Sequence, residues 1–208
     1  MLSVLGQDGL EGPITRPFGI VETTIDDSDA IISRTGYTGE DGVELVVRSE
    51  QGPQVWGRLM ELGAAPCGLG ARDVLRLEAG LRLHGTDMDA TTTPFEAGLQ
   101  RYVHMDGDFR GRDALLQQQD RGITRVLAGL NVRSRSVARH GHRVLHQATE
   151  VGVVTSGTFS PTLRANIAMA YVPPELADAG QLLDVDIRGD SVEAEVVSLP
   201  FYSRKRSG

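Results

Sequence analysis

The chain has 208 residues, of which 40% are hydrophobic and 24% are charged. This balance excludes a disordered chain and a coiled coil, and the length predicts one or two domains with a core of ordinary size. The net charge of −7, from 21 basic and 28 acidic residues, argues against a protein that binds nucleic acid over a broad basic face. The single cysteine, Cys67, excludes an internal disulfide framework and a zinc site built from several cysteines.

No segment of the sequence has the pattern of a membrane span or a secretion signal. The chain has no run approaching 18 apolar residues, and its first residues lack a basic-then-apolar pattern. We therefore expect a soluble, cytoplasmic protein with neither a membrane nor a nucleic acid as partner.

The first part of the chain mixes strand and helix patterns. Residues 1–17 hold three glycines and two prolines, which predicts an irregular lead-in segment. β-branched runs predict strands over residues 18–25, 30–33 and 43–47, the last two joined by a glycine-rich loop. Apolar residues spaced by three and four predict helices over residues 51–63 and 70–79. A third helix fits residues 111–119, which end in a polar run.

After about residue 122 the pattern becomes all-β. Short β-type runs alternate with turns that contain glycine, proline or asparagine, which favours a small barrel or sandwich. The expected strands are residues 125–132, 142–145, 151–155, 167–171, 182–187 and 192–197. We therefore predict a domain boundary near residue 122, between an α+β unit and an all-β unit.

The loop Thr35-Gly-Tyr-Thr-Gly-Glu-Asp-Gly42 is the first candidate for a functional site. Its three glycines allow sharp bends and a close approach of the backbone to a ligand, but glycines are also common in structural hairpin turns. The loop lacks the Gly-Lys-Ser/Thr ending of a phosphate loop and the spaced carboxylates of a calcium loop. Both interpretations, structural turn and ligand contact, stay open.

Two charged residues, Glu44 and Arg72, likewise allow both a structural and a ligand-binding interpretation. Glu44 lies in an apolar run, either as a solvent-facing residue of an antiparallel sheet or as a buried acceptor for a ligand with paired N–H donors. Arg72 lies in the first turn of the expected helix 70–79, where it is either a surface residue or a clamp for an anionic or carbonyl edge. Asp73 is spaced to pair with Arg76 on an ordinary surface helix.

The remaining reactive side chains predict no catalytic or metal site. His140 and His142 share a strand face, but no third ligand stands at a short fixed spacing, so we expect no metal. Cys67 is in an apolar context and is expected to be packed rather than nucleophilic. Composition and spacing alone thus predict a soluble globular protein in two parts.

Several long motifs, in the same order along the chain, resemble the aminomethyltransferase family, the T-protein of the glycine cleavage system. The resemblance runs from about residue 18 to the end of the chain. Its motifs are residues 33–45, 67–80, 92–98, 155–161, 167–171 and 199–202.

The resemblance implies a fold and a reaction. The all-β part, residues 123–208, is expected to be a small Greek-key-like barrel, and residues 18–122 an α+β folate-binding domain. The family transfers the one-carbon unit of an aminomethyl group, carried on the lipoyl arm of the H-protein, to tetrahydrofolate. The products are 5,10-methylenetetrahydrofolate and ammonia, which places the reaction in glycine catabolism and one-carbon metabolism.

The resemblance also assigns site residues. In this family the glutamate that matches Glu44 binds the pterin ring, and the arginine that matches Arg72 contacts the folate. Tyr37, on the glycine loop, is an expected ring contact, and Phe201 or Tyr202 is expected to close the site from the end of the chain. Glu96 is expected to brace the fold. No residue matches a catalytic motif, so the catalytic residues stay unassigned.

The match covers only the middle and C-terminal portions of the family pattern. The family's N-terminal half, with its folate-contacting aspartate, has no counterpart here, so we expect efficient catalysis to need that half. Two alternatives follow: a non-catalytic folate-binding module, and the folate domain of a demethylating oxidase, which the broader superfamily includes.

Overall fold

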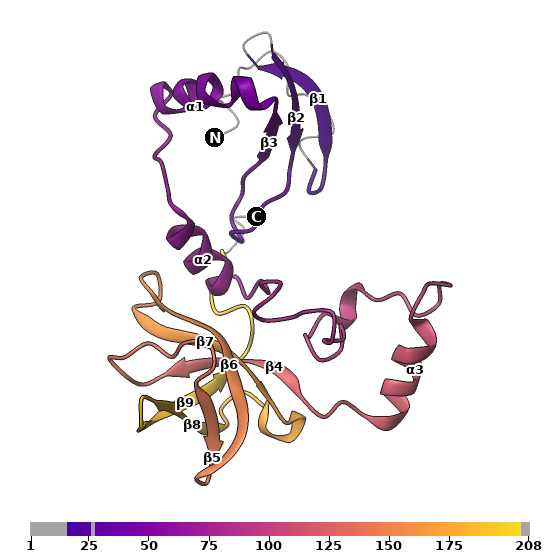
Figure 1. Cartoon of the computed structure of the whole chain (residues 1–208), viewed down its shortest axis with the longest axis vertical. Helices are drawn as coiled ribbons and strands as arrows, with labels where there is room; N and C mark the ends of the chain where they lie inside the picture. Colours follow the sequence, from indigo (N-terminus) through magenta and orange to yellow (C-terminus); the bar gives the residue numbers. More distant parts are fainter. Residues whose placement is uncertain (1–15, 26–27, 205–208) are drawn as a thin grey trace. The chain divides into compact units, whose positions relative to one another are not determined.

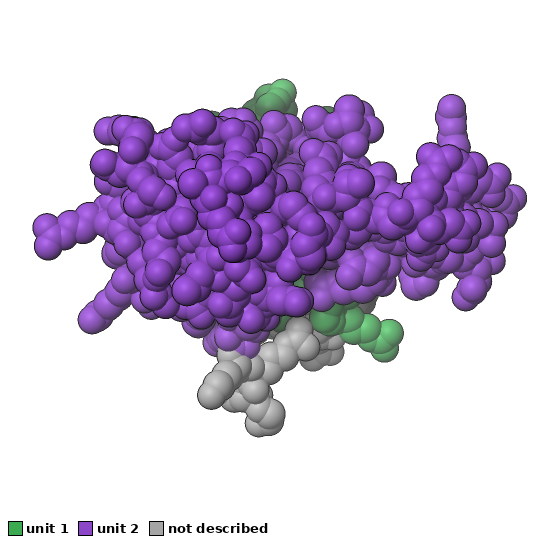
Figure 2. Space-filling model, turned by 90° about the horizontal axis from the view of Figure 1, so that it is seen from below, with its two compact units in different colours: residues 1–72 green, residues 73–208 purple. Residues whose placement is uncertain are grey.

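The computed structural model describes residues 16–25 and 28–204 (Figure 1). Most of the expected lead-in segment, residues 1–17, and part of the acidic turn at 26–29 lie outside the described residues. The chain divides into two compact units, the N-terminal unit (residues 1–72) and the C-terminal unit (residues 73–208), coloured separately in Figure 2. The boundary expected near residue 122 rests on a change of sequence pattern rather than on packing, and it stays a prediction.

The N-terminal unit is built on a three-stranded antiparallel sheet in the order β1-β2-β3. The strands are β1 (Ile20–Ile25), β2 (Ser28–Ser33) and β3 (Glu44–Val47). After a 3₁₀ turn, η3 (Ser49–Gln51), comes helix α1 (Gly52–Glu61), which has a proline in its first turn as its sequence predicted. The expected strands and helix are therefore confirmed to within about two residues, the usual uncertainty of element ends.

The two faces of this sheet differ in polarity and exposure. In the described part of the N-terminal unit the buried apolar side chains are those of Ala30, Ile32 and Val55. On the opposite face Ile31 lies directly across from Val46, and both side chains are exposed. The unit thus has a small core and an open, partly apolar sheet face.

The C-terminal unit contains a closed antiparallel barrel in the strand order β4-β7-β6-β5-β8-β9 (Figure 1). β9 pairs with β4 and closes the barrel. β5, β6 and β7 are neighbours in sequence and in space, and β4 returns beside β7, which is a Greek-key arrangement. The six strands are β4 (Val126–Val132), β5 (Arg143–His146), β6 (Thr149–Ser160), β7 (Ala165–Val172), β8 (Leu182–Ile187) and β9 (Asp190–Val197). The expected Greek-key-like barrel is confirmed.

The barrel interior is filled by aliphatic side chains that alternate along the strands. Leu130, Val144, Val154 and Val185 are completely buried and belong to one apolar cluster. β6 is longer than expected: it continues through Gly157 and ends at Ser160. Glycine is required there, since a Cβ at position 157 would overlap the backbone carbonyl of Ala138.

Helix α2 (Leu69–Glu78) leads into the barrel unit, and Gly80, two residues beyond its end, terminates it. The N–H of Gly80 donates to the Leu77 carbonyl, and the N–H of Leu81 donates to the Arg76 carbonyl, both at 2.8 Å. With the left-handed φ of 65° at Gly80, these bonds form a Schellman motif that satisfies the last helical carbonyls. The remaining short elements are η4 (Gln100–Tyr102), α3 (Arg112–Arg121) and η5 (Pro174–Leu176).

A buried ion pair joins the end of α2 to the turn that contains Asp87. The Arg76 side chain is 3% exposed and that of Asp87 is completely buried, and Arg76 Nη1 donates to Asp87 Oδ2 at 2.6 Å. Arg76 also donates to Asp73 at 2.7 Å, the expected pairing, and to Ser156 Oγ at 2.8 Å. Arg76 is therefore a core residue, whereas its helical spacing predicted a surface residue. The protein tolerates this buried charge because Asp87 neutralises it and its N–H groups are paired.

A β-bulge brings two consecutive hydroxyls to the same carboxylate. Neighbouring residues of a regular strand point to opposite faces, but the pairing of β6 with β7 shifts register between Val154 and Ser156. Thr155 Oγ1 and Ser156 Oγ consequently both donate to Asp87 Oδ1 at 2.6 Å.

The carbonyl of Asp87 accepts a hydrogen bond from the Tyr171 hydroxyl at 2.8 Å. Burial raises the pKa of Tyr171, so the phenol stays protonated and remains a donor. The buried carboxylate of Glu78 accepts hydrogen bonds from Ser160 Oγ at 2.5 Å and Thr162 Oγ1 at 3.0 Å. The end of α2 is thus fixed to the barrel by charged and hydroxyl groups.

None of the helices in the described ranges, 16–25 and 28–204, combines the length and apolar character needed to span a bilayer.

We predict that Gly157→Ala destabilises the barrel by about 1–3 kcal/mol, because backbone must move to admit the methyl group. The measurement is urea unfolding followed by far-UV circular dichroism. Gly107→Ala is the matched control: its Cβ would make an ordinary contact of 3.5 Å, so the free energy of unfolding should change by no more than about 0.5 kcal/mol. Equal effects of the two substitutions would contradict the close approach at Gly157.

We predict that Asp87→Asn lowers the free energy of unfolding by about 3–5 kcal/mol, because the Arg76 charge is left buried without its carboxylate. Asp73→Asn removes the half-exposed partner of the same arginine and should cost no more than about 1 kcal/mol. Both values come from the same urea titration. A loss for Asp73→Asn as large as for Asp87→Asn would show that burial does not determine the strength of these pairs.

Candidate functional site

The loop between β2 and β3 is tied to its own base by polar side chains. The hydroxyls of Ser33 and Thr35 are hydrogen bonded at 2.9 Å, and Thr35 Oγ1 donates to Glu44 Oε2. Further along the loop, Arg34 and Asp41 form an ion pair at 3.2 Å. The two ends of the loop are therefore linked by hydrogen bonds where strands β2 and β3 meet it.

Glu44 is the first residue of β3 and lies directly opposite Ser33 of β2. Its side chain is exposed and lies on the same face of the sheet as that of Val46. The interpretation of Glu44 as a buried acceptor is therefore wrong for this chain, and the solvent-facing interpretation is correct. In the described part of the chain the carboxylate accepts one hydrogen bond, from Thr35, which leaves acceptor sites on both oxygens.

Arg72, in the first turn of α2, stacks on the glycine loop. Its guanidinium carbon lies 5.1 Å from the centroid of the Tyr37 ring, within the range of a cation–π interaction. Arg72 is exposed and Tyr37 is half-buried. A planar cation is thus held over an aromatic ring beside the loop that ends at Glu44.

Tyr202 belongs to the C-terminal unit. Its backbone N–H donates to the carbonyl of Glu78 at 2.9 Å, which ties the end of the chain to the last residue of α2. Its side chain is 36% exposed, whereas that of Phe201 packs against the apolar cluster of Leu77 and Met169. The structure therefore groups Tyr37, Arg72 and Glu44 around one loop and places Tyr202 in the other unit.

Glu96 braces the fold, as expected. Its carboxylate accepts hydrogen bonds from the backbone N–H of Thr93 at 2.8 Å and from Arg125 Nε at 3.1 Å, while its own N–H donates to Thr93 Oγ1 at 3.2 Å. These reciprocal bonds with Thr93 have the pattern of a capping box. Burial would raise the pKa of Glu96, but the Thr93 N–H and the Arg125 guanidinium outweigh it, so the pKa lies below its ordinary value.

The other reactive side chains of the described ranges lie apart from one another or make other contacts. Within the described residues no group of three or more His, Cys, Asp or Glu side chains could hold a metal ion, and His140 Nδ1 is hydrogen bonded to the Thr155 carbonyl at 3.0 Å. Cys67 is exposed, so the expectation that it is packed is wrong. The cause is local, since residues 61–73 between α1 and the middle of α2 are all exposed.

Sequence reasoning missed the buried pair of Arg76 and Asp87. The residues that neutralise or hydrogen-bond Arg76 include Asp87 and Ser156, which lie 11 and 80 positions away in sequence. No local spacing in the sequence indicates such a pair. Considered one at a time, Arg76 and Asp87 each have the character of a surface residue.

Two family models match the chain. The model of the GCVT N-terminal domain matches residues 15–107, and the model of the glycine cleavage T-protein C-terminal barrel domain matches residues 125–203. The expected boundary near residue 122 falls between these two ranges.

Individual aminomethyltransferases are also similar to this chain in sequence. An aminomethyltransferase from Nostoc sp. strain PCC 7120 is 51% identical over 195 residues, which cover 93% of this chain and 52% of the relative. One from Synechococcus sp. strain WH7803 is 55% identical over 172 residues, 82% of this chain and 47% of the relative. The chain thus spans about half the length of the curated relatives it matches.

A solved structure is similar as well. The crystal structure of the glycine cleavage system aminomethyltransferase T from Bartonella henselae matches with a TM-score of 0.86 and 36% identity, over 96% of this chain and 56% of that one. The two family models, the relatives and this structure lead to one conclusion: the chain belongs to the glycine cleavage T-protein family, the aminomethyltransferases.

Proposed function

We propose that this chain binds tetrahydrofolate and provides part of the aminomethyltransferase of the glycine cleavage system, acting in the cytoplasm in glycine catabolism. The donor is the aminomethyl group on the lipoyl arm of the H-protein, and the products are 5,10-methylenetetrahydrofolate and ammonia. The observation that carries the proposal is the grouping of Glu44, Tyr37 and Arg72 around one loop in a chain of this family.

The surroundings of Glu44 fit a flat heteroaromatic ring with paired N–H donors. Acceptor sites on the exposed carboxylate remain open, and the Thr35 hydroxyl restricts its orientation. An ionised carboxylate accepts two parallel N–H bonds, and charge-assisted bonds of this type are about twice as strong as neutral ones. The exposed Val46 and Ile31 on the same sheet face offer apolar contact to a ring. These features support Glu44 as the residue that holds the pterin.

Arg72 and Tyr37 fit a second part of the same ligand. A guanidinium that is already stacked on an aromatic ring has lost rotational freedom before a ligand arrives, so less entropy is lost when its N–H groups pair with a carbonyl or carboxylate. Tyr202 is proposed as a further contact from the end of the chain, on the strength of the family motif alone.

Bound tetrahydrofolate supplies the nucleophilic amine that receives the one-carbon unit. This chain's own residues bind and orient: Glu44 fixes one end of the ligand by directional hydrogen bonds, and Arg72 fixes another. Orientation of this kind accounts for a large share of the rate in reactions between two bound partners. Since the chain spans about half the length of its relatives, we propose that the remaining part of the site comes from outside the residues described.

We predict that Glu44→Gln weakens tetrahydrofolate binding to the 208-residue chain about tenfold or more, since a charge-assisted pair is lost. Arg72→Ala should have a similar effect. Isothermal titration calorimetry with tetrahydrofolate measures both. The control variants are Glu61→Gln and Arg58→Ala, which change the same two residue types in an exposed ion pair of α1 and should alter the dissociation constant less than twofold.

The outcome that contradicts the site assignment is folate binding by Glu44→Gln and Arg72→Ala that equals binding by the parent chain. The alternative of a non-catalytic binding module is separated by a second measurement. Aminomethyl-loaded lipoyl carrier is added to the chain with tetrahydrofolate, and ammonia is assayed. Release of ammonia excludes the binding module, whereas tight folate binding without release is expected both of a binding module and of a transferase chain whose site is completed from outside.

A further inference from the structure

Phe18, two residues before the start of β1, combines a large apolar side chain with an unusual backbone conformation. Its side chain is 83% exposed, and its φ is 64°, in the left-handed region where a bulky residue is an outlier. Phe18 has no part in the folate site as proposed from Glu44, Tyr37 and Arg72. The ring therefore needs a reason of its own.

A tight turn imposes the left-handed conformation on Phe18. The N–H of Gly19 donates to the Arg16 carbonyl at 3.0 Å, which closes a turn with Pro17 in its second position and Phe18 in its third. A proline followed by a left-handed residue is the pattern of a type II turn, and the third position of that turn normally holds glycine or asparagine.

The same residue forms a β-bulge against the first residue after β2. The N–H of Phe18 donates to the Arg34 carbonyl at 3.1 Å, and the N–H of Arg34 donates to the Gly19 carbonyl at 2.8 Å. Two residues of one segment thus oppose one residue of the other, and the first of the two is left-handed. This is the arrangement of a G1 bulge, in which the left-handed residue is ordinarily glycine.

Phenylalanine therefore occupies a position where both the turn and the bulge favour glycine. A residue with a Cβ carries local strain in this conformation. The side chain is too exposed for packing to offset that strain. Strain that is kept at an exposed residue points to a function of the side chain, and bulges are common beside binding sites, where they redirect a side chain.

Phe18 lies at the same end of the sheet as Glu44. In the last paired row, Ile20 of β1 faces Ser33 of β2, which in turn faces Glu44 of β3. Phe18 follows beyond this row, opposite Arg34. Since neighbouring strands are about 4.8 Å apart, β1 and β3 are separated by about 10 Å, a distance that a bicyclic ring with its substituent can span. The exposed side chain of Ile20 lies between the two residues in the sequence of rows.

We propose, on the basis of the folate-binding function proposed above, that the Phe18 ring stacks on the pterin ring that Glu44 holds. A carboxylate binds a ring by the N–H groups at its edge and leaves the two faces of the ring free, whereas an aromatic side chain binds a face. Flat nitrogen heterocycles such as nucleic acid bases gain affinity from stacking on an aromatic side chain. Phe18 is thus a further binding residue of the folate site.

The test compares three substitutions of Phe18 by isothermal titration calorimetry of the 208-residue chain with tetrahydrofolate. Phe18→Leu keeps an apolar side chain but removes the ring, and it should weaken binding about fivefold or more. Phe18→Tyr keeps the ring and should stay within about twofold of the parent chain. Phe18→Gly removes both the ring and the strain, and it should weaken binding at least as much as Phe18→Leu.

Thermal unfolding, followed by far-UV circular dichroism, separates a binding role of Phe18 from a structural one. Because the side chain is strained and packs little, Phe18→Gly should leave the unfolding midpoint unchanged or raise it, although it weakens folate binding. A ring that held the fold together would give the opposite result. A lower midpoint for Phe18→Gly therefore overturns the proposal.

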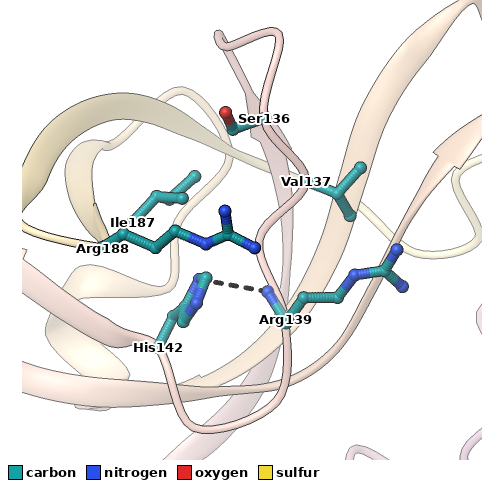
Figure 3. A pocket seen from close by; sticks show the side chains of 6 residues that line it. All are labelled: Ser136, Val137, Arg139, His142, Ile187 and Arg188. Carbon is teal, nitrogen blue, oxygen red and sulfur yellow. Dashed lines mark hydrogen bonds between the residues drawn. The ribbon is translucent and has the colours of Figure 1, made fainter.

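Arg188→Gly is the matched control for relief of strain. Arg188 is also exposed and has a φ of 59°. It lies in the β8–β9 turn, where its side chain lines a pocket of about 240 Å³ on the barrel, together with His142 and Val137 (Figure 3). This pocket has no part in the folate proposal, so Arg188→Gly should change the dissociation constant of tetrahydrofolate less than about twofold. Equal losses of affinity in Arg188→Gly and Phe18→Gly overturn the proposal.

The same titrations distinguish failure of the stacking contact from failure of the folate proposal. Absence of tetrahydrofolate binding by the parent chain contradicts the folate proposal, and the role of Phe18 with it. Binding by the parent chain that Phe18→Leu leaves unchanged overturns the role of Phe18 alone. So does an equal loss in Phe18→Leu and Phe18→Tyr, since the second variant keeps the aromatic ring.

Discussion

The barrel unit depends on how one buried guanidinium is neutralised. Arg76 is 3% exposed, and an unpaired charge at that depth would cost several kcal/mol. Asp87 neutralises it from a tight turn, two hydroxyls at a bulge in β6 donate to the same carboxylate, and the Tyr171 hydroxyl donates to the Asp87 carbonyl. The end of α2, the 81–88 turn and two barrel strands are therefore positioned by a single electrostatic requirement.

The sequence predicts the elements well where the pattern is local. β-branched runs locate the strands, and apolar spacing locates α1 and α2, because both depend on neighbours within a few positions. β6 shows the limit: it was expected to end near residue 155 and extends to Ser160. Its second half contains Gly157, which weakens a strand pattern, and the reason for that glycine is the nearby Ala138 backbone, a contact that no local pattern contains.

The candidate site also has features that the sequence predicts and features that it does not. The family motif predicts Tyr37, Glu44 and Arg72 as site residues, and the structure groups these three around one loop. The exposure of Glu44 agrees with one of the two interpretations that the strand pattern left open, whereas Cys67 was expected to be packed and is exposed. Burial of Arg76 was missed because its partners come from distant segments, and the charge pattern of α2 is that of a surface helix.

The described barrel has no edge strand, whereas the three-stranded sheet has two. Pairing of β9 with β4 closes the barrel, so its main-chain donors and acceptors face neighbours on both sides. In the described residues β1 and β3 each pair with β2 alone. Among the described strands each therefore has one flank of peptide groups that pairs with no other strand, and an exposed flank of this kind is a template for pairing with an extended segment of another chain.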